Sequence, residues 1–265
     1  MITLTICNHK GGTGKTTSSI NLAAALGLSG RRVLVVDLDP QGFLTRMMGV
    51  SEPTPDESSL VIFDQDSLPD PLPIRTLSTF DLLPSSPTLT SAARRLTRPT
   101  DVLWAKEFVE RGVHDYDVLL FDTAAAVTVY SLNALVASQA VLIPVLPEFQ
   151  PVVGAEQSFQ TAQMVRDKLN PELREPMFVF TMVDARKRNH RSYRRYMRER
   201  YGDRVLGGII RTCTTLSVSK SDGRTVYELD PHARGAIDYA NVAEELLERI
   251  TPRPVETTRL AADAV

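Results

Sequence analysis

The sequence predicts a doubly wound α/β fold, with a mostly parallel sheet and helices on both of its faces. Short apolar runs of strand length alternate with longer amphipathic stretches, and the runs lack the polar alternation of a sheet that faces water. A glycine-rich loop at residues 10–17 separates the first apolar run from the first amphipathic stretch. In such folds, ligands bind at the carboxyl ends of the strands.

The expected elements follow in chain order. The apolar runs predict strands at 2–7, 33–37, 117–122, 140–145, 177–182 and 206–210. The amphipathic stretches predict helices at 16–28 and at about 151–170, 189–201 and 234–250. Together they predict one domain over residues 1–250, in which the proline-rich stretch 51–75 is a surface excursion. Residues 251–265 are expected to form a flexible tail, because prolines interrupt them before a run of small and polar residues.

Composition excludes several classes of protein. The chain has 265 residues, 43% of them hydrophobic, and a net charge of −2, which excludes a uniformly basic nucleic-acid coat but not a local basic patch. Two cysteines, Cys7 and Cys213, cannot build a disulfide framework. No apolar run reaches the roughly 18 residues of a membrane span, and the first residues lack the features of a signal peptide. We therefore expect a cytoplasmic protein with no membrane segment.

Residues 10–17, KGGTGKTT, predict a phosphate-binding loop. Glycines let successive backbone N–H groups point at phosphate oxygens, and the following helix N-terminus adds a partial positive charge. Lys15 can reach the β- and γ-phosphates, and the Thr16 hydroxyl can coordinate Mg²⁺. The ordinary pattern has glycine where this chain has His9, so the loop is a variant with an extra lysine, Lys10. The loop residues expected to bind nucleotide are Gly11, Gly12, Thr13, Gly14, Lys15, Thr16 and Thr17.

Carboxylates follow two of the predicted strands. Asp37 and Asp39 come at the end of the strand at 33–37, and Asp122 ends the apolar run YDVLLFD. The carboxyl ends of parallel strands meet at the edge where the loop binds phosphate. There a carboxylate can hold Mg²⁺ or orient the attacking water. The sequence therefore predicts a magnesium nucleotide site at this edge.

These residues resemble the ParA/Soj branch of the ParA–MinD ATPases, whose phosphate loop is a deviant Walker A motif. The resemblance extends to about residue 250, in the segments KGGTGKTT, RRVLVVDLDPQG, LLPSSPTLTSAARRL, YDVLLFDT, SLNALVAS, PEFQPVVG and DPHARGAIDYANVAEELL. It implies a single P-loop NTPase domain, a dimer with ATP sandwiched at its interface, and hydrolysis of ATP to ADP that is slow until a partner protein stimulates it.

The resemblance also implies roles for single residues. Lys10 matches the signature lysine that reaches the partner subunit's phosphates, and Lys15 matches the phosphate-loop lysine. Asp39 matches the first-switch aspartate that positions the water, and Asp122 matches the Walker B aspartate. The expected catalytic residues are thus Lys10, Lys15 and Asp39, and the expected Mg²⁺ ligands are Thr16, Asp39 and Asp122.

The resemblance says less about two further features, the segment after Asp122 and the residues near the expected adenine pocket. The family usually has two prolines after the Walker B aspartate, where this chain has Ala124 and Ala125, and alanine leaves this switch segment looser. Arg211 and Thr212 lie in a region that borders the adenine pocket in the family, and a nucleobase contact is one interpretation of them.

A basic segment lies at residues 186–200, RKRNHRSYRRYMRER, with eight lysines or arginines and one acid, Glu199. On a helix, Tyr193, Tyr196, Met197 and Tyr201 fall on one side, to pack on the domain, and arginines fall on another, to face outward. The segment is either a solvated face without a partner or a surface that binds DNA through phosphates. Because the family binds DNA non-specifically as an ATP dimer, we expect DNA contacts from Arg186, Lys187, Arg188, Arg191, Arg194, Arg195 and Arg198.

The expected function is therefore that of a nucleoid-associated, Mg²⁺-dependent ATPase that segregates plasmid or chromosomal DNA with a ParB-like partner. The alternatives are a MinD-like ATPase at a membrane, an ATPase that positions protein cargo, a ligase or synthase with the same loop, and a nucleotide-binding module that barely hydrolyses. The membrane alternative needs an amphipathic C-terminal helix. Pro252, Pro254 and the absence of aromatic residues after 251 count against that helix.

Overall fold

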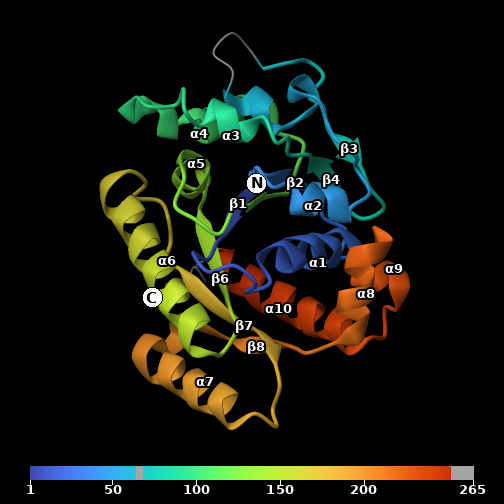
Figure 1. Ribbon diagram of the computed structural model, residues 1–265, viewed down its shortest axis with the longest axis vertical. Coiled ribbons are helices and arrows are strands. Elements are labelled where there is room, and N and C mark those ends of the chain that lie inside the picture. The colour runs from blue at the N-terminus through green and yellow to red at the C-terminus, as the bar shows by residue number, and fades with distance from the viewer. Residues whose placement is uncertain (64–67, 252–265) are drawn as a thin grey trace, which may run out of the picture.

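Eight strands form one sheet in the computed structural model, which describes residues 1–63 and 68–251. The strand order is β3-β4-β2-β5-β1-β6-β7-β8, and only β3–β4 pairs antiparallel among these neighbours (Figure 1). The strands are β1 (Ile2–Ile6), β2 (Val33–Asp37), β3 (Arg75–Thr76), β4 (Asp81–Leu83), β5 (Val118–Asp122), β6 (Ala140–Val145), β7 (Met177–Val183) and β8 (Val205–Arg211).

Helices cover both faces of this sheet (Figure 1). One face packs against α1 and α10, and the other against α4, α5, α6 and α7. The α-helices are α1 (Lys15–Leu28), α2 (Phe43–Met47), α3 (Leu89–Ala92), α4 (Trp104–Gly112), α5 (Val129–Ala137), α6 (Phe149–Lys168), α7 (Arg188–Tyr201), α8 (Thr214–Asp222), α9 (Val226–Leu229) and α10 (Arg234–Ile250). This arrangement confirms the predicted doubly wound P-loop NTPase fold.

The core is built by strands that are apolar on both faces. In β2, Val33 and Val35 pack toward α1, while Leu34 and Val36 pack toward α4 and α5. Successive side chains of a strand point to opposite faces, so a strand between two helix layers must be apolar at every position. The central strands meet this requirement, which is why they were recognisable in the sequence.

The stretch 51–75 packs closer to the domain than a surface excursion would. Ser59 begins a short 3₁₀ helix, Ser59–Phe63, in which Ile62 and Phe63 are buried in the core beneath α4 and α5. The Ser59 hydroxyl donates to the carbonyl of Asp37 at 2.7 Å, which ties this segment to the end of β2. The predicted tail is 251–265, and from residue 252 onward it lies outside the described residues. Among the helices of the described residues, none has the length and apolar character needed to cross a membrane.

Candidate functional site

The glycine-rich loop joins β1 to α1 at the carboxyl edge of the sheet. Gly12 and Gly14 have φ of 76° and 85°, in the left-handed region that side chains other than glycine rarely adopt. Gly14 is also the N-cap of α1, so the loop leads directly into the helix N-terminus. The backbone therefore curls as a phosphate-binding loop requires.

The side chains of Asn8, which follows β1, and of Ser158 in α6 hold this loop from outside. Asn8 donates from Nδ2 to the carbonyl of Pro144 at 2.8 Å, and its Oδ1 accepts the N–H of Lys10 at 2.8 Å. The N–H of His9 donates to the Ser158 hydroxyl at 2.8 Å. These bonds fix the first half of the loop against β6 and α6. The contacts Asn8–Pro144 and His9–Ser158 have no signature in the sequence, because the residues they join lie far apart in the chain.

Helix α6 also contacts the loop through a glycine, Gly154, which has no side chain. At Gly154, a Cβ atom would lie 2.7 Å from Cβ of Lys10 and 3.1 Å from its backbone nitrogen. The helix can approach the loop this closely only with glycine at this position. On the other side of the loop, Thr181 of β7 donates to the carbonyl of Thr13 at 2.8 Å.

Lys15 lies at the start of α1 and is 8% exposed. Its Nζ donates to the carbonyl of Lys10 at 3.4 Å. Burial lowers the pKa of Lys15, and the negative charge of Asp122 partly opposes this effect. Burial and the charge of Lys15 also lower the pKa of His9, which favours the neutral imidazole.

Asp122 closes the site on the opposite side of the loop. Its two carboxylate oxygens accept from the Thr16 hydroxyl at 3.0 Å and from the Ser19 hydroxyl at 2.7 Å. Burial raises the pKa of Asp122 to about 6, although both hydroxyls favour the charged form. Sequence analysis missed Ser19, but its spacing of three residues from Thr16 places it on the same face of α1 and could have revealed it.

The two aspartates after β2 have different environments. Asp37 pairs in register with Asp122 on the neighbouring strand and is fully buried. Its Oδ2 accepts the N–H and the hydroxyl of Thr45 at 3.0 and 2.7 Å, and burial beside Asp122 raises its pKa to about 8. Asp39 is partly exposed, and its Oδ1 accepts the N–H of Gln41 at 2.9 Å. Asp37 is thus a structural group, and Asp39 faces the accessible side.

Arg211 is the last residue of β8 and Thr212 follows it, next to the carboxyl end of β7. The guanidinium of Arg211 forms two bonds to Asp238 of α10, from Nε at 3.0 Å and from Nη2 at 2.5 Å. The Thr212 hydroxyl donates to the carbonyl of Met182 at 3.1 Å. The nucleobase contact remains a prediction for both residues.

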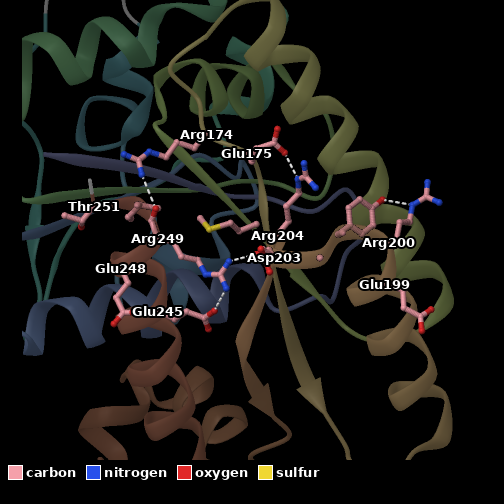
Figure 2. A pocket seen from close by; sticks show the side chains of 14 residues that line it. Arg174, Glu175, Glu199, Arg200, Asp203, Arg204, Glu245, Glu248, Arg249 and Thr251 are labelled. Atoms are coloured by element: carbon pink, nitrogen blue, oxygen red, sulfur yellow. Dashed lines mark hydrogen bonds and ion pairs between the residues drawn. The ribbon is translucent and has the colours of Figure 1, made fainter. Parts of the chain in front are cut away.

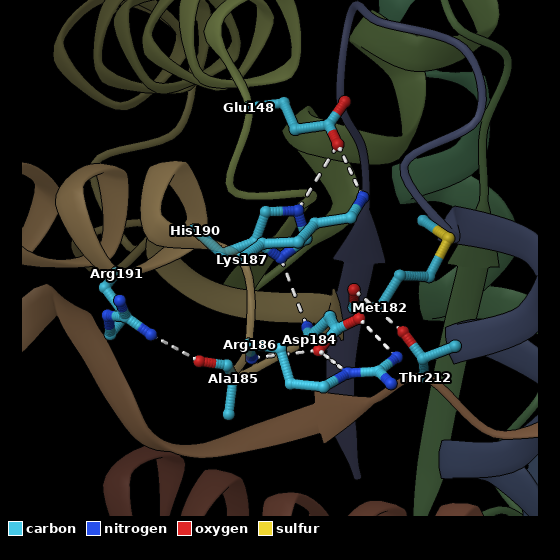
Figure 3. A network of polar contacts seen from close by, with 9 residues as sticks. All are labelled: Glu148, Met182, Asp184, Ala185, Arg186, Lys187, His190, Arg191 and Thr212. Atoms are coloured by element: carbon cyan, nitrogen blue, oxygen red, sulfur yellow. Dashed lines mark hydrogen bonds and ion pairs between the residues drawn. The ribbon is translucent and has the colours of Figure 1, made fainter.

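The seven predicted DNA-binding cations fall into two groups. Arg186 forms two bonds to Asp184, and Lys187 contacts Glu148 at 3.3 Å, so these two cations are neutralised within the chain (Figure 3). The other five lie on α7. Four of these are exposed and Arg194 is half-buried, so the expectation that all the α7 arginines face outward is wrong for Arg194. The exposed arginines of α7 are Arg188, Arg191, Arg195 and Arg198.

A wide depression of about 1200 Å³ lies at the opposite, amino edge of β7 and β8 (Figure 2). Its arginines are largely paired with groups of the chain: Arg204 contacts Glu175 at 2.5 Å, and Arg249 contacts Glu245 at 2.7 Å. Because these cations are already neutralised, the depression is not an attractive site for phosphate.

Comparison with known proteins agrees with this geometry. Residues 1–175 match a family model described as an AAA domain, AAA_31. The chain is 34% identical over 247 residues to the chromosome-partitioning ATPase Soj of Thermus thermophilus, and the match covers 93% of this chain and 96% of that protein. It is 32% identical over 246 residues to the sporulation initiation inhibitor protein Soj of Bacillus subtilis, and this match covers 92% of this chain and 97% of that protein.

A solved structure is also similar over most of the chain. Cobyrinic acid a,c-diamide synthase from Mycobacterium smegmatis, with bound ATP analogue and magnesium, has a TM-score of 0.79 and 29% identity, and the match covers 94% of this chain and 95% of that one. These two Soj relatives are more than 30% identical to the chain over more than nine-tenths of its length. On this evidence, the chain belongs to the ParA/Soj family of P-loop ATPases.

Proposed function

We propose that the protein is a Mg²⁺-dependent ATPase that dimerises around ATP and then binds DNA without sequence preference. With a ParB-like partner that stimulates its slow hydrolysis, it would segregate plasmid or chromosomal DNA on the nucleoid, in the cytoplasm. One observation carries this proposal: a ParA/Soj-type phosphate loop occurs in the same domain as a row of arginines that have no carboxylate partner among the described residues.

The residues of the loop fit a magnesium nucleotide. Backbone N–H groups of residues 11–17 and the ammonium of Lys15 would bind the phosphates. The Thr16 hydroxyl and the Asp122 carboxylate are oxygen ligands of the kind Mg²⁺ prefers, and Asp39 lies on the accessible side nearby. The raised pKa of Asp122 supports this assignment, because a buried carboxylate gains most from a nearby cation. When bound, the ion supplies positive charge to the β- and γ-phosphate oxygens.

Hydrolysis would depend on positioning and on charge stabilisation. Asp39, partly exposed and held through Gln41, would orient the attacking water. Lys15 would stabilise the charge that develops on the phosphates from within the subunit, and Lys10 of the second copy would do so across the interface. A lysine supplied in this way makes the complete site depend on dimerisation.

The surface around Lys10 supports this dimer. Phe149 and Val127 are 66% and 51% exposed, and Val153 is 37% exposed. Val153 precedes Gly154, which abuts Lys10, and Ala125, two residues before Val127, approaches Gly11. Exposed apolar side chains beside a functional loop are typical of a surface that another molecule covers. A second copy of the chain would cover them when ATP is bound.

A second candidate function is an ATP-dependent synthase, which the name of the Mycobacterium smegmatis structure suggests. Such an enzyme would turn over ATP only with a small acceptor molecule. It would have no use for unpaired arginines along α7. Measuring ATP hydrolysis with DNA and without any acceptor distinguishes the two functions.

The test of the proposed function is DNA binding over a series of salt concentrations, without nucleotide, with ADP and with a non-hydrolysable ATP analogue. We expect tight, sequence-indifferent binding only with the analogue, and an affinity that falls steeply with salt. Lys15→Ala should lose both ATP binding and analogue-dependent DNA binding, because it removes the ammonium from the phosphates. The control is Lys168→Ala, which removes an exposed lysine at the other end of α6.

Absence of DNA binding in every nucleotide state would contradict the proposal. Co-sedimentation with liposomes would then test the MinD-like alternative. Unchanged ATP affinity in Lys15→Ala would contradict the assignment of the loop.

A further inference from the structure

We propose that α7 carries a seat for one phosphodiester group of the DNA backbone, in a hollow between Arg191, Arg194, Arg195 and Arg198, with Arg194 at its base. This inference rests on the proposed DNA binding. It goes further by assigning the primary contact to the hollow and by excluding Arg186 and Lys187 from it.

The hollow has a volume of about 350 Å³ and is lined by Arg191, Arg194, Arg195, Arg198 and Glu199. The four arginines follow one another at spacings of three, one and three residues, so they share one side of the helix. Four guanidinium groups therefore surround one opening, and a single carboxylate, Glu199, lies at its rim. An anion that enters this opening meets several donors at once.

Arg194 is the member of the group that the fold leaves incomplete. Its Nε is buried and has no hydrogen-bond partner among the described residues. Its guanidinium lies over the ring of Phe180, with 5.8 Å between Cζ and the ring centroid. No carboxylate pairs with Arg194 in the part of the chain that the structure describes, and burial and the charge of Arg198 lower its pKa. A buried charged donor without a partner is costly, and a bound phosphate would offset that cost.

The neighbouring cations differ from this group. Asp184 and Glu148 neutralise Arg186 and Lys187 at the start of the segment (Figure 3). At the other end of α7, Arg200 contacts Glu156 at 3.2 Å. Between these ends, the structure gives Arg195 and Arg198 no carboxylate partner in the described part of the chain. The fold thus pairs the cations on either side of the hollow and leaves the hollow positive.

The shape of the row favours a nucleic acid backbone over a single small anion. Arg188, Arg191, Arg195 and Arg198 are exposed and spaced by three, four and three residues, which aligns them along one face. At 1.5 Å per residue, the row is about 15 Å long. A track of this length matches successive phosphates of a strand, and the hollow occupies the part of the track from Arg191 to Arg198.

The experiment compares Arg194→Lys with Arg195→Lys, using short duplex DNA and protein loaded with the ATP analogue. Both variants keep the charge, but only Arg194→Lys removes the buried Nε and the guanidinium over Phe180. We expect a loss of DNA affinity of about tenfold or more in Arg194→Lys and a change of less than about threefold in Arg195→Lys. Melting temperature and ATP affinity are measured alongside to verify that each variant folds.

A second variant keeps the test decisive if Arg194→Lys proves unstable. Glu199→Gln removes the negative charge at the rim and leaves the arginines in place, so it should raise DNA affinity by a few fold at low salt. Unchanged or weaker binding in Glu199→Gln would contradict the seat.

Three outcomes distinguish the ideas from one another. If the wild-type protein binds no DNA in any state, the proposed function fails and the seat fails with it. If it binds DNA and the two lysine variants are equal, the seat is wrong and the proposed function stands. If Arg194→Lys instead loses binding to vesicles of phosphatidylglycerol and phosphatidylcholine while DNA binding persists, the hollow takes a lipid headgroup and the proposal is overturned.

Discussion

Gly154 shows how one residue can position the phosphate loop without contacting a ligand. Glycine in a helix interior costs about 1 kcal/mol relative to alanine. Glycine is nevertheless required at this position, because α6 approaches Lys10 too closely for a methyl group. The same helix holds the loop through Ser158, four residues further on, so both contacts lie on one face of α6.

Gly154→Ala should therefore displace the loop rather than destabilise the helix. Overpacking a tight contact costs about 1–3 kcal/mol. The substitution should lower the affinity for ATP by about fivefold or more, and the helix propensity of alanine should offset part of any loss of stability. Calorimetric titration with an ATP analogue measures the first effect and thermal denaturation the second.

The matched control is Gln157→Ala, which changes an exposed residue of the same helix. ATP affinity equal to wild type in Gly154→Ala would show that the loop adapts to the methyl group.

Sequence alone predicts residues whose partners are local. The loop, with Lys15 and Thr16, was predictable because its chemistry is contained in eight consecutive residues. The pairing of Arg211 with Asp238 joins residues 27 apart in the chain and depends on how α10 packs beside β8, which no local pattern shows. The pair Asp184–Arg186 is local, two positions apart in the chain, but it was also not predicted. Sequence alone does not show whether an acid near a basic segment binds one of its arginines.

At the scale of elements, α7 shows a rotation of the predicted helix face. Met197 and Tyr201 are buried as predicted, but Tyr196 is 40% exposed and donates its hydroxyl to Glu156 at 2.8 Å. The buried side instead includes His190 and part of Arg194. Successive residues of a helix are 100° apart around its axis. A small rotation of α7 about its axis, relative to the predicted orientation, is therefore enough to turn Tyr196 toward solvent and Arg194 toward the core.

The expected elements leave out two nine-residue helices, α5 and α8, as well as several shorter elements. β4 has three residues, and the 3₁₀ helix Ser59–Phe63 lies among prolines, so neither has enough length to show a period. The central strands were predicted to within a residue or two, because burial on both faces makes them continuously apolar.

Helix α10 protects the edge of the sheet at β8. Glu245 accepts the N–H groups of Gly207 and Gly208, both at 2.8 Å, and Asp238 accepts the N–H of Arg211 at 2.8 Å. Unpaired N–H groups on an edge strand invite pairing with another chain. The two carboxylates satisfy these donors and so block that pairing.

Glu245→Gln should lower the free energy of unfolding by about 1–3 kcal/mol at pH 7, because it removes charge from two hydrogen bonds to backbone N–H groups. Burial acts to raise the pKa of Glu245, but the N–H groups of Gly208 and Gly207 and the guanidinium of Arg249 outweigh it, and the pKa lies below the ordinary 4.5. The stabilisation is therefore complete above pH 4.5 and is lost as the pH falls through the lowered native pKa.

Urea denaturation between pH 7 and pH 3 tests this prediction. The difference between wild type and Glu245→Gln should be constant from pH 7 to about pH 5.5 and should shrink below pH 4.5. Glu244→Gln, at an exposed position of the same helix, is the control and should show no such difference. A difference that persists to pH 3 would mean that the carboxylate charge is not what stabilises the edge.

At the scale of the whole molecule, α6 touches both functional surfaces. Its residues Gly154 and Ser158 hold the phosphate loop, and Glu148, its N-cap, contacts Lys187 and His190 at the start of the basic segment (Figure 3). If the loop shifts when nucleotide binds, helix α6 would therefore transmit the displacement to the beginning of α7. This arrangement gives a physical route by which ATP could control DNA binding.

Lys10 provides the sharpest test of how the whole assembly works, because its backbone belongs to the loop while its side chain is exposed. If Lys10 acts across a dimer interface, Lys10→Ala should leave ATP binding by the monomer intact. It should weaken the ATP-dependent dimer by roughly 30-fold or more, the effect of removing one partner of a buried interfacial charge pair. Sedimentation velocity with the ATP analogue measures the dimer, and Lys168→Ala serves as the control. Lys15→Ala should instead lose nucleotide and dimer together, since Lys15 acts within its own subunit. If Lys10→Ala dimerises like the wild type, the phosphates are not shared across the interface, and the dependence of hydrolysis and DNA binding on dimerisation would need another origin.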